Sequence, residues 1–521
     1  MGGLNFQSLQ DSKPAQSAGL AGALEGGPRY AALLFAVCGF ILLFFGGLGT
    51  IPLLDPDEGR YAEIPREMLL RGDFVTPRLN GVLYFEKPPL YYWLNAVALA
   101  ALSRPEIASR LTGAGCGLAG LGLAWLLGLS MGGRRTGLQA AIVLGTTPLY
   151  VALARTAIID MTVTFFLSAT LTCFWLAQEK DGDRGARPLW YGAFVSAALA
   201  TLSKGLIGIV IPGAVVFLFL LFTRRWQVLR RVPWVGGPLL FLAIAVPWHV
   251  LAAQRNPDFL WFYFIHEHFL RYATPIADRQ QPFWFFGPVV VLGMLPWSGL
   301  LPAIVTLFRR CPERLRDCPH LVFLACWAGF VILFFSVSRS KLVPYVLPAF
   351  LPLAVLVSLA LAEADPTRAR AWIRTGATIG ALLMGCLWAV GPRVAHDRSA
   401  HEVARFLKGR LGPEDEVYSY RFYPQSLPVD LGRLIGVVRY RGELAFGIDH
   451  LPPEVRAHRF PTAEQFRDRW RSSPRPIYLV LESSDLGHME GDRLAPGPIV
   501  FRQSRFLLMT NQRFPNERKP L

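Results

Sequence analysis

The feature that most constrains this chain is a succession of apolar runs, each about as long as a membrane is thick. A helix crosses a bilayer with about 17 to 25 predominantly apolar residues. Runs of this kind lie near residues 30–50, 107–131, 137–154, 157–178, 188–203, 205–222, 234–253, 283–308, 320–337, 342–362 and 372–391. The 521 residues have a mean hydropathy of +0.35, and only 17% are charged. The sequence therefore predicts an α-helical polytopic membrane protein with about 11 spans.

The basic residues between these runs indicate on which side of the membrane each loop lies, because Lys and Arg concentrate in cytoplasmic loops. One apolar segment, 88–102, is shorter than the others. If it lies on the outer interface, five basic loops face the cytoplasm: GGRRTG, EKDGDRGARP, TRRWQVLRR, FRRCPERLRDC and ADPTRARAWIR. If it spans, all five move outside. Tyr91, Tyr92 and Trp93 also suit an interface. We therefore predict an interfacial helix at 88–102.

This orientation divides the chain into three parts. Residues 1–29 are polar and rich in Gly, Ala and Ser, which predicts a flexible cytoplasmic tail. Residues 30–391 form the transmembrane domain, with a polar loop at 53–106 on the non-cytoplasmic side. Residues 392–521 lie on that same side. They combine a helical pattern, HEVARFLKGRL, with the strand-like PIYLVLES and RFLLMT, which predicts a small α/β domain.

The formal net charge of +16 does not require a nucleic-acid partner. Basic loops in a membrane protein report its orientation and suit anionic lipid headgroups. The sequence has no Gly-rich phosphate loop, no H-E-x-x-H and no G-x-S-x-G. We therefore predict membrane lipids as partners, and neither nucleic acid nor a nucleotide.

The densest polar chemistry follows the first predicted span, in LLDPDEGRYAEIPREMLLRGDFVTPRLNGVLYFEKPPLYYW at 53–93. Its first half predicts a short amphipathic helix. A carboxylate of Asp55 or Asp57 at the start of that helix would cap free amide groups. Capping needs one acid, whereas three lie within four residues. Asp57 is therefore a candidate for function as well as for capping.

The second half of this loop places Glu86 and Lys87, in YFEKPPLYYW, at the edge of the predicted interfacial helix. Pro88 suits the first turn of that helix. Two interpretations of Lys87 remain open. Its side chain extends along apolar surface to a lipid headgroup, or it is directed at one particular phosphate.

Further polar residues lie at the predicted outer ends of other spans. Asp160, in RTAIIDMTVTFFL, opens an apolar run, where an acid is expected to be paired or functional; capping of the following helix is the alternative. Lys204, in TLSKGLIG, lies on a non-cytoplasmic turn, against the charge bias. In WFYFIHEHFLRYATP, His266, Glu267 and His268 offer ligands for a divalent cation. Adjacent ligands alone do not make a metal site.

Taken together, these motifs resemble those of the integral-membrane glycosyltransferases of the GT-C type. The similarity is carried by PDEGRYAEIPREML, YFEKPPLYYW, ARTAIIDM, LSKG, HEHFLRY and SRSKLVPYVLPAFLP, over about residues 30–360. The chain looks closest to the bacterial aminoarabinose (4-amino-4-deoxy-L-arabinose) lipid A transferases and their protein-O-mannosyltransferase-like relatives. The resemblance implies a GT-C fold with about 11–13 transmembrane helices. It also implies interfacial helices in the first periplasmic loop, a periplasmic C-terminal domain and a place in the bacterial inner membrane.

The resemblance also implies roles for individual residues. The family's catalytic acidic positions fall on Asp57, Glu58 and Asp160. Its substrate- and phosphate-binding positions fall on Arg60, Lys87, Lys204, Arg271 and Tyr345. Its metal-associated pair falls on Glu86 and His268, which implies a divalent metal: zinc, magnesium or manganese.

The implied reaction is transfer of a sugar from polyprenyl (undecaprenyl) phosphate to lipid A or to another envelope glycolipid or protein. Displacing the polyprenyl phosphate develops negative charge, which Lys87, Arg271 and Tyr345 would neutralise. A hydroxyl acceptor would need Asp57 as general base. A phosphate acceptor, already ionised, would need it only for positioning. One direct displacement predicts inversion at the sugar carbon.

Two other classes of function remain open from the sequence. A lipid-linked-sugar transporter or flippase is expected to carry charge near the bilayer midplane, whereas the acids here gather at one face. An envelope scaffold would use the C-terminal domain for binding. In a scaffold, Asp57 and Lys87 need not converge on one site.

Overall fold

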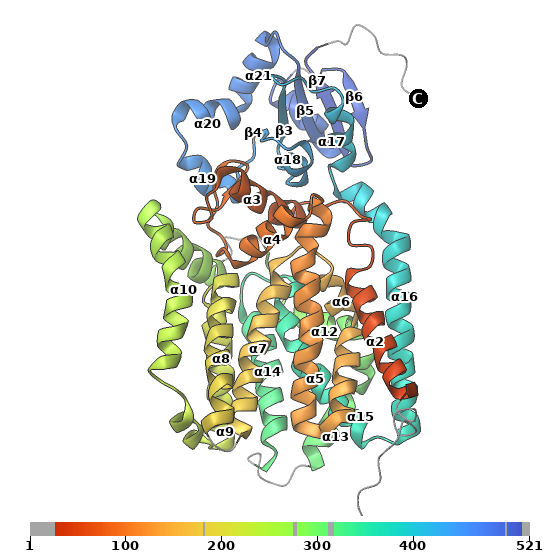
Figure 1. Cartoon of the computed structure of the whole chain (residues 1–521). Helices are drawn as coiled ribbons and strands as arrows, with labels where there is room; N and C mark the ends of the chain where they lie inside the picture. The colour runs from red at the N-terminus through yellow and green to blue at the C-terminus, as the bar shows by residue number, and fades with distance from the viewer. Residues whose placement is uncertain (1–26, 181–182, 275–278, 311–316, 495–496, 513–521) are drawn as a thin grey trace, which may run out of the picture.

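The computed structural model describes residues 27–180, 183–274, 279–310, 317–494 and 497–512. A bundle of long helices forms one end of the molecule, and a domain built on a β-sheet forms the other (Figure 1). Two helices of the first polar loop, α3 (Asp57–Arg71) and α4 (Leu90–Ala101), lie between them. Most of the predicted tail at 1–29 falls outside the described residues.

The predicted apolar runs are helical. The longer helices of the bundle are α2 (Gly27–Phe45), α5 (Pro105–Gly145), α7 (Ile159–Glu179), α8 (Asp183–Lys204), α9 (Ile207–Thr223), α10 (Gly236–Arg255), α14 (Pro319–Val337), α15 (Phe350–Glu363) and α16 (Pro366–Arg398). Shorter helices are α6 (Pro148–Ala154), α11 (Arg271–Ala273), α12 (Phe286–Gly293), α13 (Leu301–Arg310) and the 3-10 turns η1 (Trp226–Arg231), η4 (Phe283–Phe285), η5 (Trp297–Leu300) and η7 (Val343–Ala349). A π-helix, η2 (Trp261–Leu270), precedes α11.

Two predicted spans, 107–131 and 137–154, are joined more tightly than expected. The chain reverses at Gly133, whose φ of 83° lies in the left-handed region that suits Gly. On either side of the turn, a Cβ on Gly128 would lie 3.0 Å from the Cα of Gly137. Small residues let the two arms approach closely, as in membrane helix pairs.

The bundle has an aromatic cluster at its centre and an apolar outer surface. Phe323 of α14 lies 5.2 to 6.0 Å, between ring centroids, from Phe174, Trp175 and Phe219. On the periphery, α10 exposes large apolar side chains: Leu239, Leu242, Val246, Val250 and Leu251. A soluble protein rarely exposes so continuous an apolar face. The arrangement fits a surface solvated by lipid.

Length and apolarity alone support fewer spans than the 11–13 expected. Among the described residues, five helices qualify, or seven if two bent helix pairs each count as one span. The shortfall has visible causes: α9 has 17 residues, and α8 carries charged residues at both ends. The run at 283–308 is broken, since its two helical parts meet at 104°. The figure of 11–13 therefore stays a prediction.

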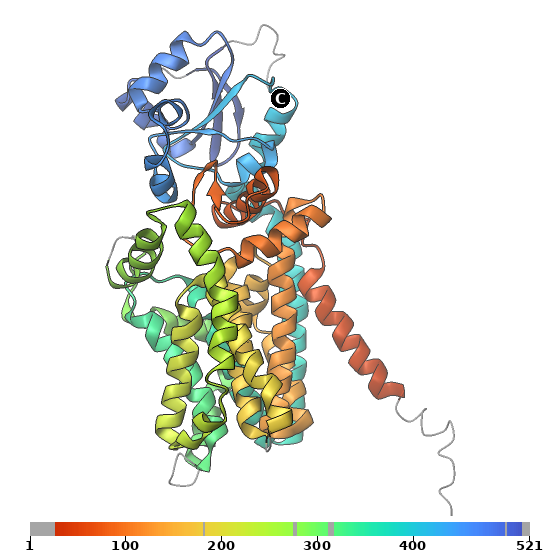
Figure 2. The same cartoon turned by 60° about the vertical axis from the view of Figure 1, so that its left-hand side comes forward.

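The segment at 88–102 forms α4, as the charge distribution of the loops predicted. This helix has 12 residues, about 18 Å at 1.5 Å per residue, which is shorter than the hydrocarbon core of a bilayer. It lies beside α3 at the end of the bundle, and the C-terminal domain packs on α3 (Figure 1, Figure 2). The first polar loop is thus a platform between the two parts of the molecule.

The C-terminal region is an α/β domain, although α16 continues to Arg398, beyond the predicted boundary at residue 391. Its five strands lie in the order β4-β3-β5-β7-β6. The first three are parallel, and β7 and β6 add antiparallel. The strands are β3 (Glu416–Tyr420), β4 (Gly436–Val438), β5 (Ile477–Glu482), β6 (Ile499–Arg502) and β7 (Phe506–Thr510). The segments PIYLVLES and RFLLMT supply β5 and β7, so both predicted strands are confirmed.

The helices of this domain are α17 (His401–Lys408), α18 (Ser426–Leu431), α19 (Ala445–Asp449), α20 (Pro453–Arg459), α21 (Ala463–Ser472) and α22 (Leu486–Gly491). The predicted helix in HEVARFLKGRL is α17. Its buried residues and those of α18 share one apolar core with Tyr61 and Ile64 of α3 and Tyr91 of α4. The domain is therefore packed onto the platform and is not merely tethered to it.

Candidate functional site

A cavity of about 420 Å³ opens between the membrane bundle and the π-helix η2. One end is polar, and seven of the residues singled out in the sequence line it: Glu86, Lys87, Lys204, Glu267, His268, Arg271 and Tyr345. The rest is apolar, with Ile207 and Val210 of α9 and Phe334 and Phe335 of α14 among its walls. The cavity suits a ligand with an anionic head and a hydrocarbon tail.

The charges at the polar end form one network centred on Glu267. Its Oε2 accepts a hydrogen bond from Arg271 Nη1 at 2.6 Å and lies 3.6 Å from Lys87 Nζ. His266 Nδ1 lies 3.1 Å from Oε1 of the same carboxylate. Arg271 Nη1 also donates to Glu86 Oε2 at 3.1 Å. Residues about 180 positions apart in the sequence are thereby brought into a single site.

The network holds two cations, Lys87 and Arg271, beside two carboxylates, Glu267 and Glu86. Burial, and then the nearby Arg271, lower the pKa of Lys87 to about 8. Burial favours the neutral form of Glu267, but the hydrogen bond with His266 and the charges of Lys87 and Arg271 outweigh it and lower the pKa of that carboxyl. Glu267 is thus ionised at neutral pH and holds Lys87 and Arg271 at the polar end of the cavity.

A second pair lies where two membrane helices end. Lys204, at the end of α8, donates to the Oδ1 of Asp160, in the first turn of α7. The same ammonium lies 4.4 Å from the centroid of the Tyr345 ring. Asp160 makes no capping hydrogen bond to α7. The capping alternative is therefore wrong, and Asp160 is a paired acid.

The three acids of the motif at the start of α3, Asp55, Asp57 and Glu58, have different partners. No side chain caps α3, so the predicted capping by Asp55 or Asp57 is wrong. Asp55 instead accepts from Ser426 N at 2.6 Å and from Ser426 Oγ at 2.7 Å, in the C-terminal domain. The Asp57 side chain is 55% exposed and pairs with Arg60 Nη1 at 3.3 Å.

Glu58 is the buried member of the motif, with 2% of its side chain exposed. Its carboxylate receives two hydrogen bonds from Arg110 of α5, at 2.8 and 2.5 Å, and two from the backbone amides of Leu54 and Ala157. All four bonds join parts of the protein to one another. Glu58 therefore anchors the start of α3 to the bundle, and its geometry suits positioning rather than contact with a substrate.

The predicted metal pair does not fit a metal ion as these side chains are arranged. The Glu86 carboxylate faces Arg271. His268 Nδ1 lies 2.6 Å from the carbonyl oxygen of Tyr263, so it donates there. A Cβ on Gly205 would lie 1.9 Å from His268 Nε2, so that nitrogen packs against backbone.

A different group has ligand atoms close enough for a metal ion. Among the described residues, Glu106, His401 and Asp430 form one such group of three, with ligand atoms within 4.8 Å of one another. His401 Nδ1 and Asp430 Oδ2 are 3.2 Å apart. These residues join the start of α5 to the C-terminal domain.

Sequence reasoning passed over several residues that the fold brings to the site. Glu267 was predicted only as a possible metal ligand, whereas its side chain is 4% exposed and pairs with Arg271, four residues further along the chain. Arg110 lies inside the predicted apolar run at 107–131, where an ionisable residue is expected to be paired with another group. The contacts of Gln425 and Glu443 with Arg60 could not be predicted from the sequence, because both residues lie in the C-terminal domain, far from Arg60 along the chain.

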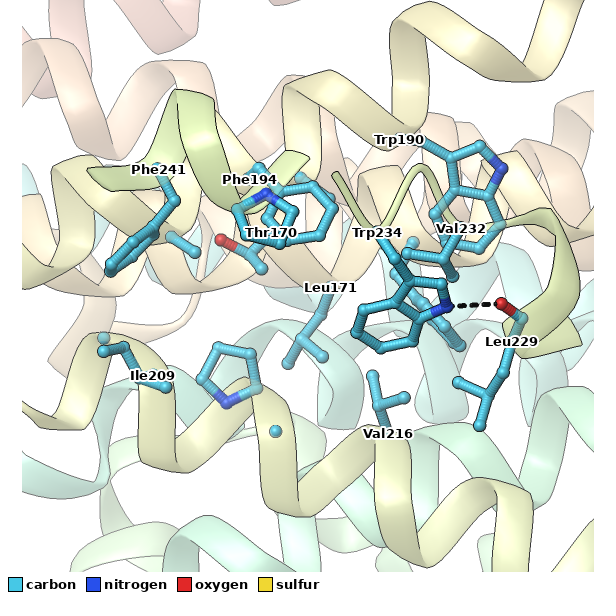
Figure 3. A pocket seen from close by; sticks show the side chains of 17 residues that line it. Thr170, Leu171, Trp190, Phe194, Ile209, Val216, Leu229, Val232, Trp234 and Phe241 are labelled. Atoms are coloured by element: carbon cyan, nitrogen blue, oxygen red, sulfur yellow. Dashed lines mark hydrogen bonds between the residues drawn. The ribbon is translucent and has the colours of Figure 1, made fainter. Parts of the chain in front are cut away.

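A separate cavity of about 380 Å³ lies within the membrane bundle, between α7, α8, α9 and α10. Figure 3 shows its apolar lining, including Leu171, Val216 and Phe241, and the hydrogen bond from Trp234 Nε1 to the carbonyl oxygen of Leu229. No ionisable side chain lines it. It can hold hydrocarbon but offers no group for chemistry, so it is not the candidate site.

Two family models match the chain. Residues 31–263 match the dolichyl-phosphate-mannose-protein mannosyltransferase family, and residues 403–511 match the aminoarabinose transferase C-terminal domain. The second match corresponds to the α/β domain.

Curated relatives carry the name undecaprenyl phosphate-α-4-amino-4-deoxy-L-arabinose arabinosyl transferase. The protein of Yersinia enterocolitica is 31% identical over 377 residues, which cover 70% of this chain and 67% of that one. Those of Aeromonas hydrophila and Pseudomonas aeruginosa are 33% and 34% identical and cover 61% and 63% of this chain. The aligned part spans only 58% and 60% of these two relatives.

Among solved structures, ArnT from Cupriavidus metallidurans bound to undecaprenyl phosphate is similar over 93% of this chain and 98% of that one, with a TM-score of 0.81 and 28% identity. The archaeal oligosaccharyltransferase AglB from Archaeoglobus fulgidus matches 90% of this chain and 71% of its own, with a TM-score of 0.56 and 12% identity, which shows a likeness of fold alone. These matches confirm the predicted fold class, a GT-C membrane domain followed by a small α/β domain.

Proposed function

The chain belongs to the family of undecaprenyl phosphate-α-4-amino-4-deoxy-L-arabinose arabinosyl transferases, and we propose that it transfers a sugar from polyprenyl phosphate to an envelope acceptor. The proposed donor is undecaprenyl phosphate carrying 4-amino-4-deoxy-L-arabinose, after the names of the relatives. The proposed acceptor is lipid A or another envelope glycolipid or protein. The proposed place of reaction is the periplasmic face of the inner membrane.

The observation that carries this proposal is the cavity with one cationic end and apolar walls. Lys87 and Arg271 at that end suit a phosphate, and the Phe334 and Phe335 side chains suit an isoprenoid chain. A polyprenyl phosphate combines these two chemistries in one molecule.

The chemistry follows from where charge develops. As the bond between the sugar carbon and the phosphate oxygen breaks, the phosphate gains negative charge. Lys87 and Arg271 are already held in place by Glu267, so they stabilise that charge without reorganising. We place Lys204 and Tyr345 beside the same phosphate, because both line the cavity and contact each other.

The acceptor end is assigned to the acidic motif. We propose that Asp57, the exposed acid of that motif, faces the acceptor and that Arg60 orients it. Asp57 removes a proton from a hydroxyl acceptor and positions a phosphate acceptor. Asp160, paired with Lys204, links the two ends. Glu58 acts by anchoring α3.

A single displacement inverts the sugar carbon. With an α-linked donor, such as the one named for the relatives, the product is β-linked. The alternative function, a transporter of lipid-linked sugars, has no support from these relatives, which are named as transferases. A metal at Glu86 and His268 is not needed for the steps above, since Arg271 and Lys87 supply the positive charge.

The test is a reconstituted transfer assay. The purified protein in liposomes receives undecaprenyl phosphate-linked aminoarabinose and lipid A, and mass spectrometry follows the product. We expect lipid A with one added pentosamine and free undecaprenyl phosphate in equal amounts. Movement of intact donor across the bilayer without any transfer would instead establish the transporter.

A further inference from the structure

The C-terminal domain is linked to the acidic motif at the start of α3 by one buried arginine, which belongs to α3 itself. Arg60 of α3 is 7% exposed. Its Nε donates to Gln425 Oε1 at 3.0 Å, and its Nη2 lies 3.6 Å from Glu443 Oε1. Both partners belong to the C-terminal domain. The remaining arm, Nη1, is the one that meets Asp57.

The partners of Arg60 are themselves held in place. Gln425 is fully buried, and its Nε2 donates to the Oε1 of Glu443. Tyr440 donates its hydroxyl to Glu443 Oε2 at 2.6 Å. Each carboxylate oxygen of Glu443 therefore has a partner, and the amide of Gln425 has only one orientation that satisfies both of its contacts. The guanidinium of Arg60 is fixed on two sides before it meets Asp57.

This arrangement changes the strength of the contact with Asp57. An ion pair between an exposed Asp and a free Arg three residues away contributes little, because ordering both side chains offsets the attraction. Here Arg60 is already ordered by the C-terminal domain, so only Asp57 loses freedom. Burial opposes the charge on Arg60, yet Tyr84, Glu443 and Asp57 together keep its pKa well above the usual value.

On the basis of the transferase activity proposed above, we propose that Gln425 and Glu443 are positioning residues, which hold Arg60 so that it orients Asp57 toward the acceptor. The C-terminal domain then has a part in the reaction. It completes the acceptor end of a site whose donor end lies in the membrane domain.

The competing interpretation is that these contacts only attach the domain. Other contacts already do so: Asp55 binds Ser426, and Asn80 exchanges two hydrogen bonds with the backbone of Ile435. Arg459 also donates to the carbonyl oxygen of Asn80, at a part of the interface that does not touch Arg60. A variant there is a control for docking alone.

The experiment measures kcat, the KM for the donor and the melting temperature of the full-length protein in liposomes. We expect Glu443→Gln to lower kcat on the order of tenfold, with little change in donor KM or melting temperature. Tyr440→Phe, which loses one hydrogen bond to Glu443, should lower kcat about threefold and provides a milder variant if Glu443→Gln fails to fold. Glu443→Asp should recover part of the rate.

Two further variants separate positioning from attachment. Combining Glu443→Gln with Arg60→Gln should be no slower than Arg60→Gln alone, since both act through one side chain. Arg459→Gln and the exposed Glu454→Gln should keep the wild-type kcat. The inference is overturned if both Glu443→Gln and Tyr440→Phe react at the wild-type rate, if the double variant shows additive losses, or if Arg459→Gln is equally slow. A wild-type protein that transfers no sugar would contradict the proposed function instead.

Discussion

The donor and acceptor ends of the proposed site are built in different ways. At the donor end, Lys87, Glu267 and Arg271 all come from the membrane domain, and their side chains are 4% to 16% exposed. At the acceptor end, the Asp57 side chain is 55% exposed, and its arginine is held by the C-terminal domain. In the proposed site, the cations for the leaving phosphate are therefore ordered within one domain, whereas the acceptor end is completed by contacts with the C-terminal domain.

The largest expected effect comes from breaking the anchor that joins the start of α3 to the bundle. Arg110→Met removes the partner of Glu58 and leaves a buried carboxylate uncompensated, which should destabilise the fold by about 3–5 kcal/mol. The melting temperature of the purified protein measures this. Arg104→Met is the matched control, because Arg104 is exposed and makes one hydrogen bond, to Gly49. Equal melting temperatures for the two variants would show that Glu58 is not an anchor.

The next effect tests the donor end alone. Arg271→Gln removes the cation shared by Glu86 and Glu267 and should lower kcat/KM for the donor by about 10²- to 10³-fold. Steady-state transfer with varied donor concentration measures it. Arg255→Gln, at an exposed pair with Asp73, serves as the control. A loss below threefold at Arg271 would remove it from the phosphate site.

A smaller and acceptor-dependent effect tests the other end. Asp57→Asn should lower kcat by about 10²-fold with a hydroxyl acceptor, because the general base is lost. With a phosphate acceptor the loss should stay within about tenfold, because orientation alone is impaired. Assays with both acceptors compare the two values. Full activity with each acceptor would exclude Asp57 from the site.

The smallest expected effect is a dependence of the kcat/KM for the donor on pH. Lys87 has a pKa near 8, so its ammonium is charged below that pH and loses its charge above it. The donor kcat/KM, which reports the free enzyme, should therefore fall as the pH rises through about 8. Lys87→Arg, whose guanidinium stays charged, should lack this inflection. An identical pH profile for the two proteins would mean that another group titrates.

The outline of the fold could be predicted from local sequence. Apolar runs of membrane length predicted the helices, the basic loops predicted a short interfacial helix where α4 lies, and strand-like segments predicted β5 and β7. The predictions about capping were wrong, because Asp55 bonds to Ser426 and Asp160 pairs with Lys204, each far away in the chain. A capping rule considers only residues close together in the chain, so it cannot predict a hydrogen bond between residues that meet only in the folded protein.

What the sequence determined by itself is the kind of molecule and the inventory of its site. Periodicity and charge asymmetry are local properties, and the motifs around Asp57, Lys87 and Arg271 resemble a known family. What only the tertiary structure decided is which of these groups meet. Neighbouring acids such as Asp57 and Glu58 differ in exposure because Arg110 lies beside one and solvent beside the other. Glu443 joins the site only because a separate domain packs on α3, since contact energies depend on distance in space and not on distance along the chain.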